Sequence, residues 1–113
     1  MTHAGPGFAD GQVMTVFRSR RRLEAESAYL EVAREMELAA RKCVGFIDFK
    51  TFVADDGERV ALVTFDSWAA HRAWRDDPRH RQAQERGREE FYLEYSIQVG
   101  ACEHVTRWTR EPG

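Results

Sequence analysis

The residues best suited to chemistry lie between Val60 and Tyr95. One helical pattern in this stretch carries His71, Trp74 and Arg75, and residues three or four apart share one face of a helix. Histidine accepts a proton near neutral pH, arginine stabilises an oxyanion, and tryptophan offers a flat apolar surface. His80 follows in the next helical run. Together these side chains suit the deprotonation of an aromatic substrate and the stabilisation of its anion.

Each of these residues also has an ordinary structural interpretation. Large aromatic residues at helical spacing normally fill a core, which favours Trp68 and Trp74 as core or subunit-interface anchors. His71 and His80 lie in arginine-rich segments and would also suit solvated or ion-paired positions. An enzyme needs an enclosed pocket with a titratable group, whereas a purely structural domain fills that space with large side chains.

Composition narrows the class of protein. The 113 residues suit one domain, and a net charge of -2 with 32% charged residues lacks the unbalanced positive charge of a nucleic-acid-binding surface. No apolar run is long enough to cross a bilayer, and the start lacks the features of a signal peptide. We therefore expect a cytoplasmic protein with neither nucleic-acid nor membrane partners. Cys43 and Cys102 are isolated and suggest free thiols, with no metal site.

Hydrophobic periodicity predicts the order β-α-β-β-α-β, an α+β ferredoxin-like fold with a four-stranded antiparallel sheet and both helices on one face. Strands are predicted over residues 13–18, 46–54, 58–65 and 92–102, and helices over residues 23–42 and 68–90, the latter interrupted at Asp77-Pro78. The domain then spans residues 12–102. Residues 1–11 form a predicted disordered leader, and residues 103–113 form a C-terminal tail in which Trp108 either anchors on a partner subunit or frays.

Local signals mark the ends of these elements. Gly45 suits the left-handed conformation of a helix C-cap, and Asp56-Gly57 is a strong hairpin signal. Either Asp66 or Ser67 can cap the following helix. The pair Asp77-Pro78 restarts the helix with a cap and a proline at the first position.

Strict alternation along the last strand predicts that Tyr92 and Tyr95 lie on opposite faces of the sheet, so that at most one lines any cavity. On an earlier strand, Asp48 and Lys50 share a face with Phe46 and are candidates for a cavity pair or a cross-sheet salt bridge. Apolar residues occupy both faces of these strands. A homodimer in which two sheets pack face to face would cover the face that the helices leave bare.

Three segments together carry a family resemblance. They are Val44-Gly45-Phe46, the passage from Val63 to His71 (VTFDSWAAH) and the run from Trp74 to Gln84 (WRDDPRHRQAQ). As a set they resemble the antibiotic biosynthesis monooxygenase family of dimeric α/β barrels over residues 12–102, although Val44 stands where the family often has proline. The resemblance implies one of several activities: oxygenation of phenols, anthrones or quinols without metal or flavin, haem degradation, or no assigned reaction.

The haem branch of the family fits this chain poorly. The resemblance aligns its tryptophan with Trp74, but its iron-binding histidine falls on Gln84 and its asparagine falls near Arg18 or Ser19. One of the three positions matches. His80 lies one helical turn before Gln84, so the alternative that His80 binds the haem iron from a displaced position stays open.

The sequence therefore predicts a cofactor-independent monooxygenase that oxidises an aromatic, polyketide-like or quinol substrate with O2. The alternatives are a non-catalytic dimeric barrel that binds a small hydrophobic ligand and a haem-binding member of the family. No metal and no cofactor are expected, and the expected partners are a second copy of the chain and a small aromatic molecule. The predicted catalytic residues are His71, Trp74, Arg75 and His80, and the predicted substrate-binding residues are Trp68, Phe17, Phe49, Tyr95 and Gln84.

Overall fold

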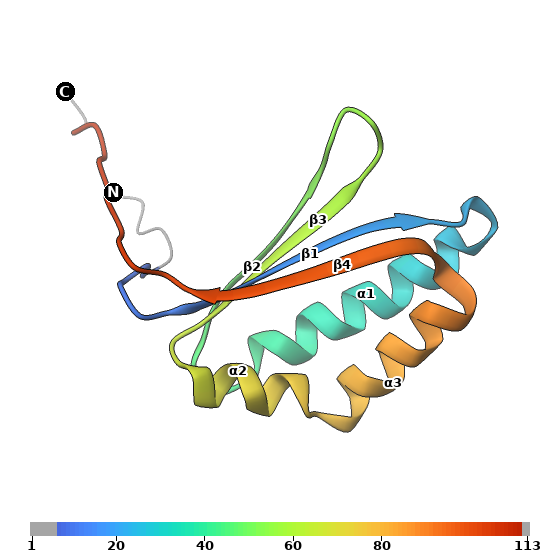
Figure 1. Cartoon of the computed structure of the whole chain (residues 1–113), viewed down its shortest axis with the longest axis horizontal. Coiled ribbons are helices and arrows are strands. Elements are labelled where there is room, and N and C mark those ends of the chain that lie inside the picture. The colour runs from blue at the N-terminus through green and yellow to red at the C-terminus, as the bar shows by residue number, and fades with distance from the viewer. Residues whose placement is uncertain (1–6, 112–113) are drawn as a thin grey trace.

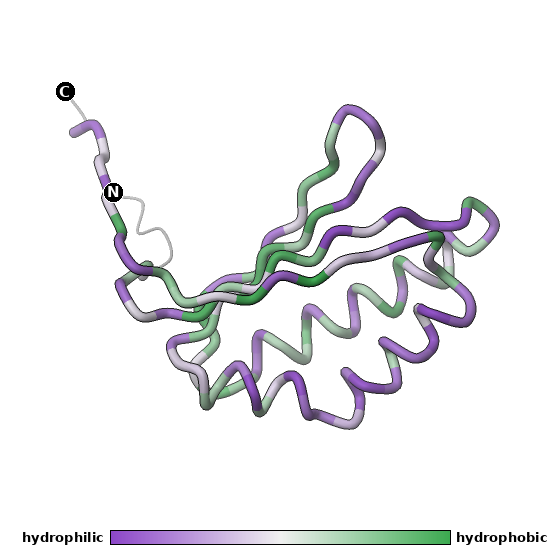
Figure 2. Tube along the Cα trace, viewed as in Figure 1, coloured by the Kyte–Doolittle hydropathy of each residue, from purple (hydrophilic) through white to green (hydrophobic). Residues whose placement is uncertain are grey.

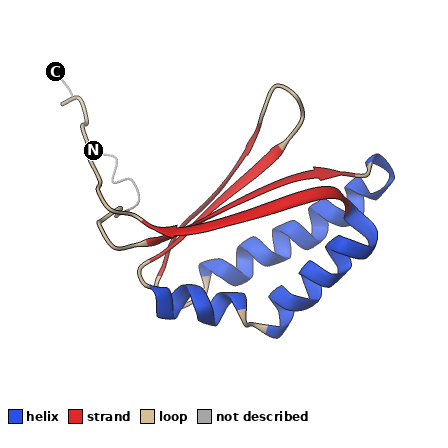
Figure 3. Ribbon diagram, in the orientation of Figure 1, coloured by secondary structure: helices blue, strands red, loops and turns tan. Residues whose placement is uncertain are grey.

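The computed structural model describes residues 7–111 and has a single antiparallel sheet with every helix on one face (Figures 1 and 3). The elements are β1 (Val13–Arg21), a 3-10 turn (Leu23–Ala25), α1 (Glu26–Arg41), β2 (Phe46–Val53), β3 (Arg59–Phe65), α2 (Trp68–Arg75), α3 (Pro78–Arg86), a π-helical turn (Gly87–Phe91) and β4 (Tyr92–Ala101). The strand order is β2-β3-β1-β4. The ferredoxin-like fold predicted from the sequence is confirmed, with the second helix divided into α2 and α3.

The break between α2 and α3 follows from its capping residues. Ser67 accepts a hydrogen bond from the Ala70 backbone nitrogen at 3.1 Å and so begins α2. Asp77 accepts one from the Arg79 backbone nitrogen at 2.8 Å, and Pro78 takes the first position of α3, where its missing N–H is not needed. Both predicted helix starts are confirmed, and Ser67 rather than Asp66 is the first cap.

Gly45 is fixed by both its conformation and its surroundings. Its φ of +85° is in the left-handed region, and a Cβ there would lie 2.5 Å from Asp66 Oδ1 and 2.7 Å from the Ala70 Cβ. We expect Gly45→Ala to lower the free energy of unfolding by at least about 1 kcal/mol more than Gly57→Ala does in urea denaturation. Gly57 is the matched control because its φ is +88° and a Cβ there meets nothing within 4 Å. Equal losses in the two variants would contradict the steric explanation.

The core lies where the C-terminal end of α1 and the helix α2 meet the sheet. Its buried members are Ala39, Ala40, Val63, Phe65 and Trp74. The small residues of α1 let that helix approach the strands closely, and the aromatic rings fill the remaining space. Figure 2 shows that the hydrophobic residues of the sheet are concentrated in the central parts of the strands.

Two register shifts in the sheet change which side chains face the helices. One lies between Arg20 and Arg21, where β1 pairs with β4, and the other lies between Phe46 and Asp48, where β2 pairs with β3. An extra residue on one strand breaks the alternation that a regular strand imposes. The prediction that Tyr92 and Tyr95 lie on opposite faces is therefore wrong, because both line the cavity between sheet and helices.

The second register shift corrects the prediction for β2. Phe46 packs against the core on the helix side, and Phe49 lines the cavity on that same side. Asp48 and Lys50 are absent from the lining of the cavity, and no salt bridge joins them within residues 7–111. Neither alternative proposed for that pair is seen.

The helical run predicted to reach about Glu90 continues to Phe91, but its last turn is π-helical. After Arg86 the chain forms the π-helical turn, and Gly87 packs directly beneath the ring of Tyr92. A Cβ at Gly87 would overlap that ring. The glycine therefore allows Tyr92 to turn into the space between helices and sheet.

The segments that flank the domain run beside each other (Figure 1). Gly11 N donates to the Cys102 carbonyl at 2.8 Å, and Val105 N donates to Asp10 Oδ1 at 2.9 Å. Trp108 is 75% exposed. Residues 1–6 of the predicted leader and residues 112–113 of the predicted tail lie outside the described residues, so these boundaries stay predictions. Within residues 7–111, no helix has the length and apolar character needed to cross a membrane.

Candidate active site

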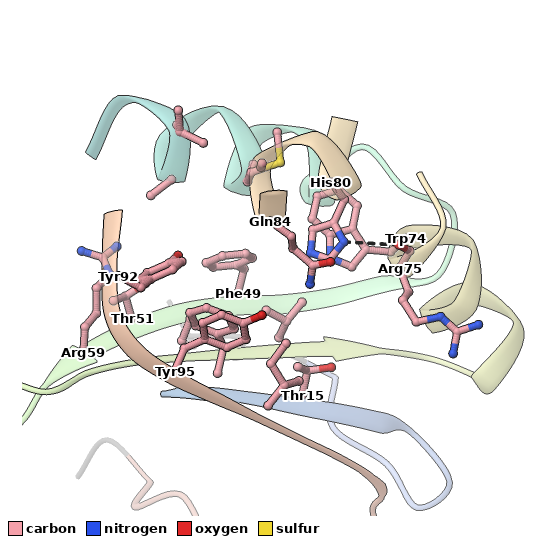
Figure 4. Close-up of a pocket in the computed structure, with 18 of the residues that line it drawn as sticks. Thr15, Phe49, Thr51, Arg59, Trp74, Arg75, His80, Gln84, Tyr92 and Tyr95 are labelled. Atoms are coloured by element: carbon pink, nitrogen blue, oxygen red, sulfur yellow. Dashed lines mark hydrogen bonds between the residues drawn. The ribbon is translucent and has the colours of Figure 1, made fainter. Parts of the chain in front are cut away.

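A cavity of about 320 Å³ lies between the sheet and the helices (Figure 4). All four strands and all three α-helices contribute to its lining. This volume is at the lower end of the range for small-molecule sites. The chain therefore leaves space where a purely structural domain would have large side chains.

His80 and Trp74 form the polar and aromatic end of the cavity. Trp74 is buried, and its ring centroid lies 4.6 Å from that of His80. His80 Nδ1 lies 3.4 Å from the backbone carbonyl oxygen of Arg75 (dashed line in Figure 4). Because a carbonyl oxygen only accepts, this contact is a hydrogen bond when Nδ1 carries the proton. The neutral ring then has Nε2 free to accept a proton from a substrate.

His71 lies on the same side of the cavity but is less well defined as a base. It is buried, and its Nδ1 lies 3.5 Å from Thr15 Oγ1. A hydroxyl group either donates or accepts, so this contact does not select one tautomer. Its ring also contacts Trp68 edge to face at 5.9 Å.

Both histidines have a lowered pKa. Burial is the main cause for His80 and for His71, and the neighbouring Arg75 and Arg72 lower the pKa of His71 further. Burial removes water that would solvate the charged ring. Both imidazoles are therefore neutral at pH 7, which is the state a general base requires.

The lowered pKa values also predict how stability depends on pH. The unfolded chain binds protons at these histidines more tightly than the folded chain does. The free energy of unfolding is therefore highest above the ordinary histidine pKa of about 6.5. It decreases as the pH falls below that value toward the lower pKa that these histidines have in the folded protein. Urea denaturation between about pH 7.5 and pH 5 should show this decrease, and it should be smaller in His80→Gln.

His104→Gln is the matched control for this experiment, because His104 is exposed in the C-terminal segment. It should leave the decrease unchanged. A pH dependence that is identical in His80→Gln and in the wild type would contradict a burial effect at His80.

The ionisable side chains that line the cavity include bases but no carboxylates of the described residues. Two arginines, Arg59 and Arg75, and the two histidines line it, together with three tyrosines. None of the described residues that line it is an aspartate or a glutamate. Arg75 is half exposed, and its Nε donates to Asp76 at 3.2 Å, so part of its charge is already neutralised. Such a lining favours an anionic or acidic ligand.

The far end of the cavity is aromatic, and the sequence identified Phe17 and Tyr95 there but not Tyr29 or Tyr92. The ring centroids of Phe17 and Tyr95 lie 5.5 Å apart in a stacked arrangement, and Tyr92 lies 5.5 Å from Tyr95. Tyr29, on α1, lies 5.8 Å from Tyr92. Burial raises the pKa of Tyr92, with a further contribution from Tyr29, so its hydroxyl stays protonated. Tyr29 belonged to a recognised apolar stripe, but nothing in its spacing distinguished a cavity position from a core position.

The structure brings together most of the predicted site residues. Those that line the cavity are Phe17, Phe49, His71, Trp74, Arg75, His80, Gln84 and Tyr95. Trp68 is not among the lining residues; it is 43% exposed, and its ring contacts that of His71, which does line the cavity. Tyr29, Arg59, Tyr92 and Thr15 line the cavity but were not predicted as site residues.

The residues present do not fit the haem-binding pattern that the family resemblance implies. Gln84 lines the cavity where the family resemblance places the iron-binding histidine, and a neutral amide is not a usual ligand of haem iron. The nearest imidazole, His80, packs against Trp74 and Arg75. Among residues 7–111 there is also no group of three or more His, Cys, Asp or Glu side chains that suits a metal ion.

The fold and the cavity define an α+β ferredoxin-like domain with room for a small molecule between its sheet and its helices. The uncharacterised protein YqjZ of Bacillus subtilis is 30% identical over 76 residues, which is 67% of each chain. The chain belongs to the antibiotic biosynthesis monooxygenase family. No family model matches it.

Solved structures agree with this class at the level of the fold. A Deinococcus radiodurans protein named as a candidate antibiotic biosynthesis monooxygenase superposes with a TM-score of 0.77 at 12% identity, over 87% of this chain and 99% of that one. SnoaB, a cofactor-independent oxygenase from Streptomyces nogalater, superposes with a TM-score of 0.69 at 17% identity, over 89% of this chain and 97% of that one. At these identities the similarity concerns the fold, and the reaction must be argued from the cavity.

Proposed function

We propose that the protein is a monooxygenase that oxidises an acidic aromatic substrate, such as an anthrone or a quinol, with O2 and without metal or flavin. The observation that carries this proposal is the composition of the cavity. Two neutral histidines and two arginines line it together with aromatic side chains, and none of the described lining residues is a carboxylate. The name of SnoaB, a cofactor-independent oxygenase on the same fold, supports the reaction type.

In this mechanism His80 is the general base. Its Nε2 takes a proton from the acidic C–H or O–H of the substrate, and the electron-rich anion transfers one electron to O2. The resulting carbon radical and superoxide recombine to form a C–O bond. For an anthrone, the hydroperoxide then loses water as its O–O bond breaks, and the carbonyl of a quinone forms. One O2 is consumed, one water is released, and no external reductant is needed.

The other residues orient the substrate and stabilise its anion. Trp74 gives one wall of the cavity, and Phe49 and Tyr95 lie along its length (Figure 4). Arg75, at the same end as His80, supplies positive charge near the anion that His80 produces. The Gln84 amide also lines this end and is suited to a hydrogen bond with a substrate oxygen.

The experiment that tests the proposal is oxygen uptake by metal-stripped protein with a panel of anthrones, quinols and simple phenols. The variant Ala33→Phe adds a ring to a position that lines the cavity, and Ala73→Phe adds one to an exposed position on α2. Uptake that Ala33→Phe abolishes and Ala73→Phe retains would support the proposal. Binding of these compounds without uptake would instead favour a non-catalytic ligand-binding domain.

We also infer that two copies pack through the face of the sheet that the helices leave bare (Figure 1). Met14 and Val16 on β1 alternate with the cavity residue Thr15, and their partners on β3 are Thr64 and Leu62. Met14 is 38% exposed in the single chain. A second copy would remove this apolar face from water, as the family resemblance implies.

Light scattering after gel filtration should therefore give a mass near twice 13.1 kDa for the wild type. Val16→Asp places a charge at the centre of the bare face and is expected to give the monomer mass, because an unpaired charge is strongly disfavoured in an apolar interface. Arg34→Asp, on the exposed surface of α1, is the control and should stay dimeric. A wild-type protein that is monomeric at micromolar concentration would contradict the inferred interface.

A further inference from the structure

Arg59 occupies the end of the cavity opposite His80. Figure 4 shows Arg59 and Tyr92 on one side and His80, Trp74 and Arg75 on the other. Arg59 begins β3, four residues before Val63, which packs in the same core cluster as Trp74. Four residues of a strand span about 13 Å. The two cationic ends are thus separate, and a single aromatic ring is too short to contact both.

Arg59 lacks the carboxylate partner that most arginines in this chain have. The adjacent arginines Arg18 and Arg20 pair with Glu58 and Asp56 at 2.7 Å. Arg59 forms no ion pair with any carboxylate of residues 7–111, and its guanidinium lies over the ring of Tyr29, 5.2 Å from the centroid. A cation that lines a cavity without a counterion favours an anion in that cavity.

Two tyrosines lie at the same end of the cavity as this guanidinium. Tyr29 and Tyr92 both line the cavity and contact each other, and a tyrosine hydroxyl can donate to an anion. Ser19 is the cross-strand neighbour of both Arg59 and Tyr95. Its Oγ is buried and has no hydrogen-bond partner, which is exceptional for a polar atom in a folded protein. Ser19 is not one of the lining residues, so the groups at this end that can contact an anion are the Arg59 guanidinium and the hydroxyls of Tyr29 and Tyr92.

We propose that Arg59, together with the hydroxyls of Tyr29 and Tyr92, forms an anion-binding subsite for a carboxylate group on an extended aromatic substrate. The inference rests on the proposed function in that it assigns a substrate class to the same cavity. The carboxylate binds at Arg59, the fused rings lie along Phe49 and Tyr95, and the reacting carbon is held near His80. A substrate without the acidic group would enter the cavity but would lack this contact.

The test compares the binding of anthraquinone-2-carboxylate and anthraquinone-2-carboxamide by isothermal titration calorimetry. The two probes have nearly the same shape and differ in charge, and both are already oxidised, so binding is measured without turnover. The wild type is expected to bind the carboxylate about tenfold or more tightly than the carboxamide, as a hydrogen-bonded charge pair provides. Arg59→Gln should remove this preference and change the affinity for the carboxamide by less than about threefold.

Two further variants separate a binding role from a structural one. Arg59→Lys keeps the charge and should keep part of the preference, whereas Arg34→Gln removes a charge from the exposed surface of α1 and should keep all of it. Equal affinities of the wild type for the two probes, no binding of either probe, or a preference that survives in Arg59→Gln would overturn the subsite. A melting temperature lowered in Arg59→Gln with the preference intact would show that Arg59 has a structural role only.

Failure of this inference is distinguishable from failure of the proposed function. A carboxylate preference that depends on Arg59, found in a protein that consumes no O2, would leave the subsite standing and remove the oxygenase. Oxygen uptake with neutral and acidic substrates alike, in a protein that binds the two probes equally, would support the oxygenase and remove the subsite.

Discussion

Replacing His80 with glutamine is expected to lower kcat for the oxidation of the substrate by about 10²- to 10⁴-fold, the usual effect of removing a general base. Glutamine is similar in size and cannot accept a proton near neutral pH, so the change removes the base with little change in volume. His80 is the stronger candidate because its Nδ1 contact with the Arg75 carbonyl leaves Nε2 free. The measurement is steady-state oxygen uptake at saturating substrate.

The pH profile tests the assignment to His80 independently. Because burial lowers the pKa of His80, kcat/KM should be constant at neutral pH and should decrease only below the ordinary histidine value of about 6.5. The acid limb should disappear in His80→Gln, where the residual rate is independent of that ionisation. His71→Gln is the matched control. If it caused the larger loss and removed the acid limb, His71 rather than His80 would be the base.

The largest expected effect on stability is that of Phe65→Ala, with a decrease of about 3–5 kcal/mol in the free energy of unfolding. Phe65 has no exposed surface, and its ring contacts those of Phe46 at 6.1 Å and Trp74 at 6.5 Å. Its removal leaves a cavity beneath α2 that the rigid strands cannot fill. Domains of this size have a total stability of about 5–15 kcal/mol, so the variant should be only marginally folded.

Urea denaturation followed by circular dichroism measures this loss, with Phe8→Ala as the control because Phe8 is 40% exposed outside the sheet. The control is expected to change stability by less than about 0.5 kcal/mol. A loss below about 1.5 kcal/mol for Phe65→Ala would mean that the core relaxes around the missing ring and that Phe65 does not fix α2 against the sheet.

Much of the fold was predictable because the residues that begin and end its helices and form its turns act locally. Gly45 ends the passage after α1 with a positive φ, Gly57 turns the β2–β3 hairpin, and Asp77 with Pro78 starts α3. Each residue acts through its own backbone preferences, which a sequence displays directly. His71 and Trp74 were placed together for a related reason, since helical spacing fixes which side chains share a face.

The position of Tyr92 beside Tyr95 at the far end of the cavity was not predictable, for an equally specific reason. The register shift beside Arg21 places Tyr92 and Tyr95 on the same side, although their spacing along a regular strand separates them. No residue type in that stretch predicts the register shift, because the shift depends on the pairing between β1 and β4. Arg59 is a further case: its role follows from the absence of a counterion among the described residues, and spacing carries no information about that. Trp68 shows the converse, because it shares a helix with His71 and yet lies outside the lining.

Oxygenation in this cavity is tested most directly by supplying metal-stripped protein with an anthrone under ¹⁸O2 and analysing the product by mass spectrometry. One ¹⁸O atom in the new carbonyl of the quinone, formed by the wild type and strongly reduced in both His80→Gln and Ala33→Phe, is the result we expect. A product that carries oxygen from water, or a rate unaffected by either variant, would show that the cavity described here is not the site of an oxygenase.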